Sequence, residues 1–183
     1  SNVIHGSNIP MAVLGVMILW FGWFGFNGGS ALSANGVAAN AFVVTNTSAA
    51  VAVLVWMLLD CIYVKKPTML GAATGAIAGL AAITPASGFV DVKGALVIGA
   101  ISSVICFYMV VFVKGKLGYD DSLDAFGVHG IGGFIGTIAV GIFATPIVQG
   151  AYKGALFGNF KLLKAQSIAA GVVALYTAIV TFI

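Results

Sequence analysis

The sequence contains no arginine and no glutamate, and only 7% of its 183 residues carry a charge, whereas 61% are hydrophobic. A soluble domain has about 25% charged residues, so this chain could not cover a water-facing surface and its solvent must be largely lipid. The net charge of +3 is spread over short loops. Because nucleic acid needs a clustered basic surface, we expect no nucleic-acid partner.

Cysteine is also scarce. Cys61 and Cys106 form no motif, so they predict neither a metal site nor a redox pair. We interpret both as structural, and Cys106 as a small apolar residue inside a span. We expect no metal, no organic cofactor and no enzymatic activity.

Long apolar runs dominate what is present. No charged residue occurs before Asp60. A single helix of that length would be about 90 Å long, against a hydrocarbon core of about 30 Å, so it must fold back, and residues 33–36 (SANG) are the most suitable break. Continuous apolar runs of about 20 residues are typical of helices rather than barrel strands.

The sequence thus predicts an all-α integral membrane protein with six transmembrane helices in one domain. The expected spans lie near 10–34, 36–59, 68–88, 94–113, 122–146 and 165–183. The lysines divide equally between the two sides of this arrangement, so the positive-inside rule gives no orientation. One side carries Lys65, Lys66, Lys114 and Lys116, and the other carries Lys93, Lys153, Lys161 and Lys164.

Most of the 25 glycines lie inside the spans, and several repeat every four residues. Small residues at this spacing let helix backbones approach closely in lipid, so we expect close helix contacts there. Lining of a narrow pore is the alternative. The repeats are Gly71, Gly75 and Gly79, then Gly132 and Gly136, and Gly25 and Gly29.

A mixed stripe lies on one face of the first expected helix. Trp23, Phe26, Asn27 and Ser30 are spaced i, i+3, i+4 and i+7. Aromatic faces attract cations, and the oxygens accept hydrogen bonds from N–H donors. The set suits a small cation with N–H groups. The alternative is a tryptophan interface anchor with polar side chains that join helices.

His129 is the only histidine within an expected span. Ionisable groups in the membrane are costly and mark functional sites, and a neutral imidazole can both donate and accept a hydrogen bond. The alternative is a histidine bonded to a neighbouring helix. Because His129 follows Asp124 by only five positions, a kinked or deeply starting helix is needed to bring it to mid-membrane.

Two further sets have a functional and a structural interpretation. Thr74 and Thr84 could line a polar path, but threonine more often bonds its own helix at i−4. Asp120, Asp121 and Asp124 could receive a cation, but carboxylates there suit a helix N-terminus. We favour the structural interpretation for both sets.

Three segments resemble the signatures of the ammonium transporter family. Residues 23–30 read WFGFNGGS, residues 70–80 read LGAATGAIAGL and are followed by TPA at 84–86, and residues 120–130 read DDSLDAFGVHG. The resemblance covers nearly all of the chain and favours the ammonium transporter branch over the related Rhesus proteins. It implies a homotrimer with one pore per subunit and eleven helices, the first ten forming two inverted five-helix repeats.

By this resemblance the chain is the second repeat and part of the last helix, and Lys65, Lys66, Lys114 and Lys116 would face the cytoplasm. A PII-type signalling protein would then be a possible partner on that face. The protein would lie in the cell membrane as a multi-pass protein, the cytoplasmic membrane if the organism is prokaryotic.

The resemblance also implies roles for single residues. Ser30 would accept a hydrogen bond from ammonium at an outer recruitment site, and Phe26 would be one of two stacked gate phenylalanines. Trp23 would line the pore further in, His129 would be one of two paired histidines, and Thr84 would lie near the inner mouth. The other histidine, gate phenylalanine, outer-site tryptophan and structural aspartate belong to the first repeat. This chain alone could not form the pore.

The expected function is ammonium or ammonia transport, with methylammonium as an analogue. Ammonium would be deprotonated, and ammonia would cross a hydrophobic histidine-lined pore. An ammonium sensor coupled to a signalling module is the alternative, and a signalling extension in the full gene would favour it. A non-transporting scaffold is a third class, against which the polar stripe and His129 argue.

Overall fold

The computed structural model describes residues 8–182, and all regular secondary structure within that range is helical. Six of these helical segments are long and apolar enough to cross a membrane, which confirms the predicted all-α membrane architecture. His5 and Ile183 lie outside the described residues. The helices are α1 (Ile9–Gly29), α2 (Gly36–Tyr63), α3 (Met69–Ile83), α4 (Val92–Tyr108), α5 (Lys114–Leu117), α6 (Ile131–Phe143) and α7 (Phe160–Phe182).

Shorter turns extend three of these helices. The 3₁₀ turn η1 (Thr84–Ala86) follows α3, and the π-helical turn η2 (Met109–Val113) joins α4 to α5 as one continuous helix. The π-helical turn η3 (Phe126–Gly130) precedes α6, and η4 (Ala155–Phe157) lies in the α6–α7 loop.

Polar residues at the predicted breaks begin the helices. Each accepts a hydrogen bond from the backbone N–H three residues ahead, which satisfies one of the unpaired donors of a first helical turn. The capping residues are Asn8 for α1, Asn35 for α2, Thr68 for α3 and Asp91 for α4.

Several helix ends differ from the expected ranges. The first helix ends at Gly29 rather than near 34, because residues 30–35 form the turn in which Leu32 has φ 55°. The fourth continues to Leu117 rather than 113 and ends at Gly118, whose φ of 66° suits glycine.

The fifth and sixth spans also differ. Helical structure of the fifth begins with η3 at Phe126, not near 122, and ends at Phe143 rather than 146, because residues 121–124 form a turn. The sixth helix begins at Phe160 rather than near 165, where Asn159 Oδ1 accepts from the N–H of Lys161 at 3.1 Å.

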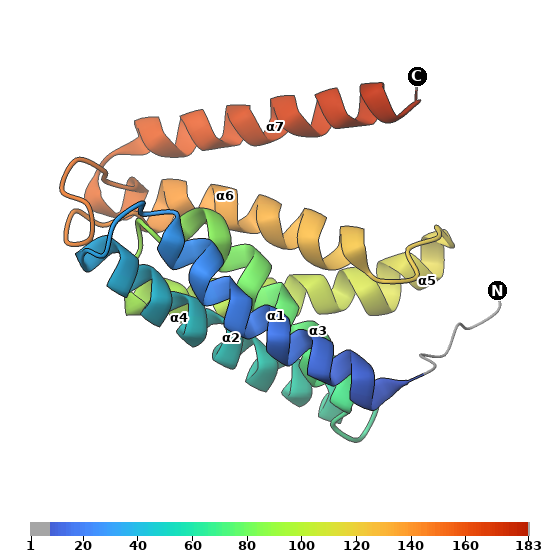
Figure 1. Ribbon diagram of the computed structural model, residues 1–183. Coiled ribbons are helices and arrows are strands. Elements are labelled where there is room, and N and C mark those ends of the chain that lie inside the picture. The colour runs from blue at the N-terminus through green and yellow to red at the C-terminus, as the bar shows by residue number, and fades with distance from the viewer. Residues whose placement is uncertain (1–7, 183) are drawn as a thin grey trace.

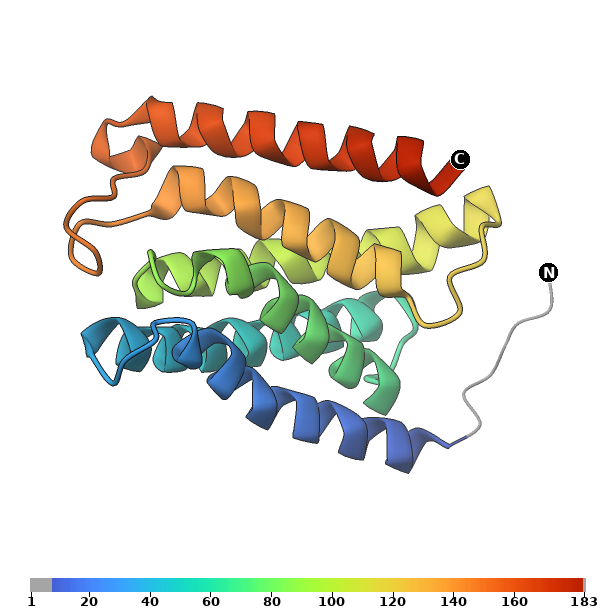
Figure 2. The same cartoon turned by 45° about the horizontal axis from the view of Figure 1, so that its top comes forward.

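The helices run back and forth between two ends of the molecule (Figure 1). One end carries the α1–α2 turn, the α3–α4 connection and the α6–α7 loop, and we call it the Ser30 end. The opposite end carries the α2–α3 turn, α5 and residues 118–124, and we call it the Lys65 end. Both views show α7 on the outside of the molecule beside α6 (Figures 1 and 2).

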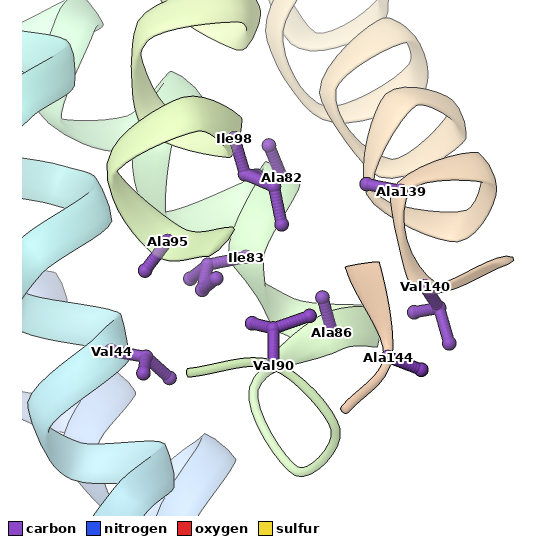
Figure 3. Close-up of a cluster of buried hydrophobic side chains, with 10 residues drawn as sticks. All are labelled: Val44, Ala82, Ile83, Ala86, Val90, Ala95, Ile98, Ala139, Val140 and Ala144. Carbon is purple, nitrogen blue, oxygen red and sulfur yellow. The ribbon is translucent and has the colours of Figure 1, made fainter. Parts of the chain in front are cut away.

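Helices α2, α3, α4 and α6 pack around a core of small and branched side chains. Figure 3 shows one of its two clusters, in which Val44 of α2, Ile83 of α3 and Ile98 of α4 meet beside α6. The second cluster joins Trp56 of α2 and Phe107 of α4. Most of α3 is buried.

The glycine repeat of α3 lies at close helix contacts, as predicted. A Cβ added at Gly75 would come within 2.7 Å of the Trp56 Cβ, and one at Gly79 within 2.6 Å of the Ser48 carbonyl oxygen. The backbones of α2 and α3 approach so closely only because these side chains are missing. Gly132 and Gly136 similarly face α3.

The repeat of α1 behaves differently. A Cβ added at Gly25 or Gly29 would meet no other atom within 4 Å, and both residues are exposed. Within residues 8–182 these two glycines therefore make no close helix contact, and the expectation stays a prediction for the complete protein.

Candidate functional site

Three aromatic rings follow one another on the exposed side of α1 and η3. The ring centroids of Trp23 and Phe26 lie 5.8 Å apart, and those of Trp23 and His129 lie 6.4 Å apart. Phe26 is 64% exposed, His129 is exposed and Trp23 is half-buried. The fold thus brings together residues separated by about a hundred positions, and the three rings form a row, which we call the aromatic row.

The indole of Trp23 is held by Thr84. Trp23 Nε1 donates to Thr84 Oγ1 at 2.7 Å, and Thr84 Oγ1 donates to the Leu80 carbonyl oxygen at 2.7 Å. The indole N–H is therefore occupied, and what Trp23 offers to a ligand is its π-face. Thr84 makes the predicted i−4 bond, and so does Thr74, to the Leu70 carbonyl oxygen.

The position of Thr84 corrects one expectation. Thr84 follows α3 at the end remote from Lys65 and Lys66. It lies beside Trp23 rather than at a mouth on the lysine side that the resemblance assigns to the cytoplasm.

Ser30 ends the aromatic face of α1. Its Oγ donates to the Phe26 carbonyl oxygen at 2.7 Å, and the residue is exposed. Because the only hydroxyl hydrogen is used in this bond, the oxygen lone pairs are left as acceptors. Ser30 is thus prepared to receive an N–H donor rather than to donate.

Asn27 leaves the stripe that its spacing suggested. It is 4% exposed, and its Nδ2 donates to Thr45 Oγ1 of α2 at 2.9 Å. It therefore joins two helices, as the alternative interpretation proposed, and does not lie with Phe26 and Ser30 on the exposed side. Thr45 was not singled out from the sequence, because nothing in α2 alone distinguishes it.

His129 lies deeper than its distance from Asp124 suggested. The Val128 carbonyl oxygen is 3.9 Å from the sulfur of Cys106, and Cys106 lies near the middle of the continuous helix Val92–Leu117. The π-helical turn η3 starts at that depth because α5 and residues 118–124 extend past it (Figure 1). The sequence required a kinked helix or a helix that starts deep in the membrane to bring His129 to this position, and the structure shows the second.

Comparisons with known proteins place the chain in a family. The sequence profile of the Ammonium Transporter Family matches residues 1–183. The chain belongs to the ammonium transporter family. It is 57% identical to ammonium transporter Amt1 of Archaeoglobus fulgidus over 181 residues, which cover 98% of this chain and 45% of that protein. It is therefore a multi-pass membrane protein.

Solved structures of the family have the same fold. The crystal structure of Candida albicans Mep2 matches with a TM-score of 0.92 and 35% identity over 99% of this chain and 41% of that one. A structure titled Sensor Amt Protein matches with a TM-score of 0.85 and 35% identity over 94% of this chain and 42% of that one. The chain spans less than half the length of the family members it matches.

One aspartate of residues 120–124 caps the helix that carries His129. Asp121 Oδ1 accepts from the N–H of Ala125 at 2.8 Å, and Oδ2 accepts from those of Phe126 and Gly127 at 3.0 and 3.2 Å. The predicted capping role is thus confirmed for Asp121, whose carboxylate accepts three backbone N–H bonds at the start of the helix.

The other two aspartates have different partners, which corrects the capping prediction for them. Asp124 has φ 54° and forms an ion pair with Lys114 at 2.7 Å. Asp120 accepts from Ser122 Oγ at 2.9 Å. The sequence did not reveal the ion pair, because Lys114 and Asp124 meet only after the chain reverses at Gly118. Within residues 8–182 no three histidine, cysteine or acidic side chains gather as a metal site.

Proposed function

We propose that this chain supplies one half of an ammonium-conducting pore, in which an aromatic and hydroxyl site recruits ammonium and a row of rings passes ammonia. The observation that carries the proposal is the aromatic row, which joins two of the segments that resemble family signatures and leaves the rings of Phe26 and His129 exposed. A complete family member is more than twice as long as this chain, so its remaining half would supply the opposite wall.

Recruitment would use Ser30 and Phe26 at the Ser30 end. The ring of Phe26 supplies cation–π attraction of roughly 1–2 kcal/mol, and the Ser30 lone pairs accept one N–H. This combination concentrates ammonium without trapping it. Its support is the bond from Ser30 Oγ to the Phe26 carbonyl oxygen, which directs the hydroxyl to accept.

Passage would use Trp23 and His129. An unpaired ion in a low-dielectric pore is so costly that a buried group tends to neutralise instead. The apolar π-face of Trp23 and a neutral imidazole therefore favour ammonia over ammonium. The proton that ammonium releases would travel separately, and a second imidazole facing His129 would share one proton with it.

Assembly and partners are part of the same proposal. The complete protein would be a homotrimer, and a PII-type protein would dock at the Lys65 end. Mass measurement of the detergent-solubilised complete protein tests the first point, since a monomer as the only species contradicts it.

Ammonium sensing is the second candidate function. It is favoured by one specific observation, the likeness to the structure titled Sensor Amt Protein. A kinase-like or cyclase-like segment in the full gene would support sensing, and its absence would favour transport.

The deciding experiment replaces His129 by alanine in the complete protein. We expect ammonium current on a solid-supported membrane to be lost or its ion-versus-gas selectivity to change, while expression and assembly mass stay normal. Thr137→Val is the control, because Thr137 lies on the same helical span and bonds only the Gly133 carbonyl oxygen. Unchanged current, selectivity and cellular uptake in His129→Ala would refute the proposed mechanism.

A further inference from the structure

Lys114 is bound to the turn that precedes the helix of His129, and the proposed pore does not use it. Its Nζ donates to the Asp121 carbonyl oxygen at 2.5 Å and to Asp124 Oδ1 at 2.7 Å. The two charged side chains are 27% and 24% exposed. In Figure 1 residues 118–124 return from α5 to the span that contains α6, which brings the turn beside the lysine. One amino group therefore fixes two points of a short turn.

The same turn sets the start of η3. Asp124 has φ 54°, a left-handed conformation that is uncommon outside glycine. Its carbonyl oxygen accepts from the N–H of Val128 at 2.9 Å, and the Asp121 carboxylate accepts from the N–H groups of residues 125–127. His129 directly follows Val128, so a displacement of the turn reaches the imidazole through a single hydrogen-bonded turn of helix.

Two π-helical turns lie against each other beside this clamp. The turn η2 ends at Val113, directly before Lys114, and η3 contains His129. A Cβ added at Gly127 of η3 would lie 3.0 Å from Val110 Cγ2 of η2, so the two turns are in contact. A π-helical turn is rare and frequently marks a functional site. Its extra residue rotates every later side chain about the helix axis, so the start of η3 decides where the imidazole points.

We propose that Lys114 is a positioning residue for His129, which keeps the imidazole beside Trp23 by clamping the turn at 121–124. The inference rests on the proposed transport function and adds to it a residue outside the aromatic row. An ion pair that is a quarter exposed contributes little to the stability of a whole protein, but it is enough to choose between two placements of one turn. Loss of the lysine should therefore leave the fold intact and displace the imidazole.

The test is Lys114→Met in the complete protein, because methionine keeps most of the side-chain length and removes both hydrogen bonds. We expect maximal methylammonium uptake to fall about ten-fold or more, since a shift of about 1 Å in a reacting group can cost about a hundred-fold. The half-saturating concentration should stay unchanged, because recruitment lies at the Ser30 end. Lys114→Arg keeps the charge and should restore most of the uptake. Lys116→Met is the matched control, since Lys116 is an exposed lysine of the same short helix.

A spectroscopic signature separates positioning from a general loss of structure. The ring centroids of Trp23 and His129 lie 6.4 Å apart, so the imidazole is part of the surroundings of the indole. With every other tryptophan of the complete protein replaced by phenylalanine, emission from Trp23 should change in Lys114→Met in the same direction as in His129→Ala. Lys114→Arg should restore the emission, and the melting temperature of Lys114→Met should stay near that of wild type.

Unchanged emission in Lys114→Met overturns the inference, and so does unchanged maximal uptake or an equal fall in Lys116→Met. If Lys114→Met does not fold, Asp124→Asn takes its place, because asparagine tolerates the left-handed conformation and removes the charge of the partner. Failure of both variants to fold also overturns the inference, since the pair would then be needed for the fold rather than for His129. A wild type that does not transport, but whose emission still depends on Lys114, would refute the proposed function and leave the positioning of His129 standing.

Discussion

Helices α3 and α1 are both apolar and rich in glycine, yet α3 is buried along most of its length, whereas Asn27 is the only buried residue of α1. The difference lies in what the glycines face. Those of α3 lie against the backbone and side chains of α2, whereas those of α1 at positions 15, 22, 25 and 29 meet no other atom of residues 8–182 within 4 Å. Since lipid tails are as apolar as the side chains, hydrophobicity does not choose between these outcomes, and close backbone approach does.

The same comparison separates residues that hold other side chains in place from residues that remain available to a ligand. Thr84 of η1, directly after the packed helix α3, accepts the hydrogen bond that holds the Trp23 indole. The unpacked face of α1 carries Phe26 and Ser30, whose groups remain available to a ligand. The predictions below test this division, beginning with the largest expected effect.

Gly79→Val should prevent folding of the complete transporter. A Cβ at Gly79 would lie 2.6 Å from the Ser48 carbonyl oxygen and 2.7 Å from the Ala52 Cβ. Overpacking costs typically about 1–3 kcal/mol and occasionally more, and a clash with backbone, which cannot give way, lies at the upper end. Gly15→Val on α1 should cost far less, because no atom of residues 8–182 lies within 4 Å of a Cβ added there. The measure is the yield of monodisperse protein in detergent. An equal loss of yield in Gly79→Val and Gly15→Val would contradict the comparison, because it would show that α1 is packed as closely as α3.

Ser30→Ala should weaken recruitment of methylammonium. A hydrogen bond to a charged group contributes roughly 1.5–3 kcal/mol, so the half-saturating concentration for uptake should rise about ten- to a hundred-fold. Ser167→Ala is the matched control, because Ser167 on α7 is also exposed and donates to the i−4 carbonyl of Leu163 at 2.8 Å. An unchanged concentration in Ser30→Ala would remove Ser30 from the recruitment site.

Asp121→Ala should lower both thermal stability and uptake. It removes the acceptor of three backbone N–H bonds at the start of η3, and loss of a cap costs about 0.5–2 kcal/mol. The melting temperature should fall, and uptake should fall because His129 loses its fixed position. Asp120→Ala supplies the baseline, since its carboxylate contacts only Ser122. Identical melting curves for the two variants would show that the cap does not matter.

Thr84→Val should have the smallest effect. It leaves the Trp23 N–H without its acceptor, a loss of about 1 kcal/mol. With every other tryptophan of the complete protein, Trp20 and Trp56 included, replaced by phenylalanine, emission from Trp23 reports whether the ring moves, and uptake should fall by less than in His129→Ala. Thr84→Ser keeps the hydroxyl and should behave as wild type. If Thr84→Val leaves the emission unaltered, Thr84 does not hold the ring.

Much of the fold followed from local rules. Charge scarcity and apolar run length predicted six helices, and polar residues at the breaks, such as Asn35 and Asp91, became the caps that begin α2 and α4. The helix ends near Leu117 and Phe126 could not be placed, because the turn between them depends on the Lys114–Asp124 ion pair and on the Asp121 cap.

The sequence by itself determined that the chain lies in lipid, where its helices run and which residue types form the site. Hydropathy, helix capping and i, i+4 spacing decide these features, and each of them acts within a few residues. Only the tertiary structure decided which way each member of the stripe faces. It turned Asn27 inward to Thr45, tied Trp23 to Thr84 and brought His129 beside Trp23 at the depth of Cys106. Those partners lie on other helices, and the packing of small residues between helices, which no single segment encodes, sets which of them meet.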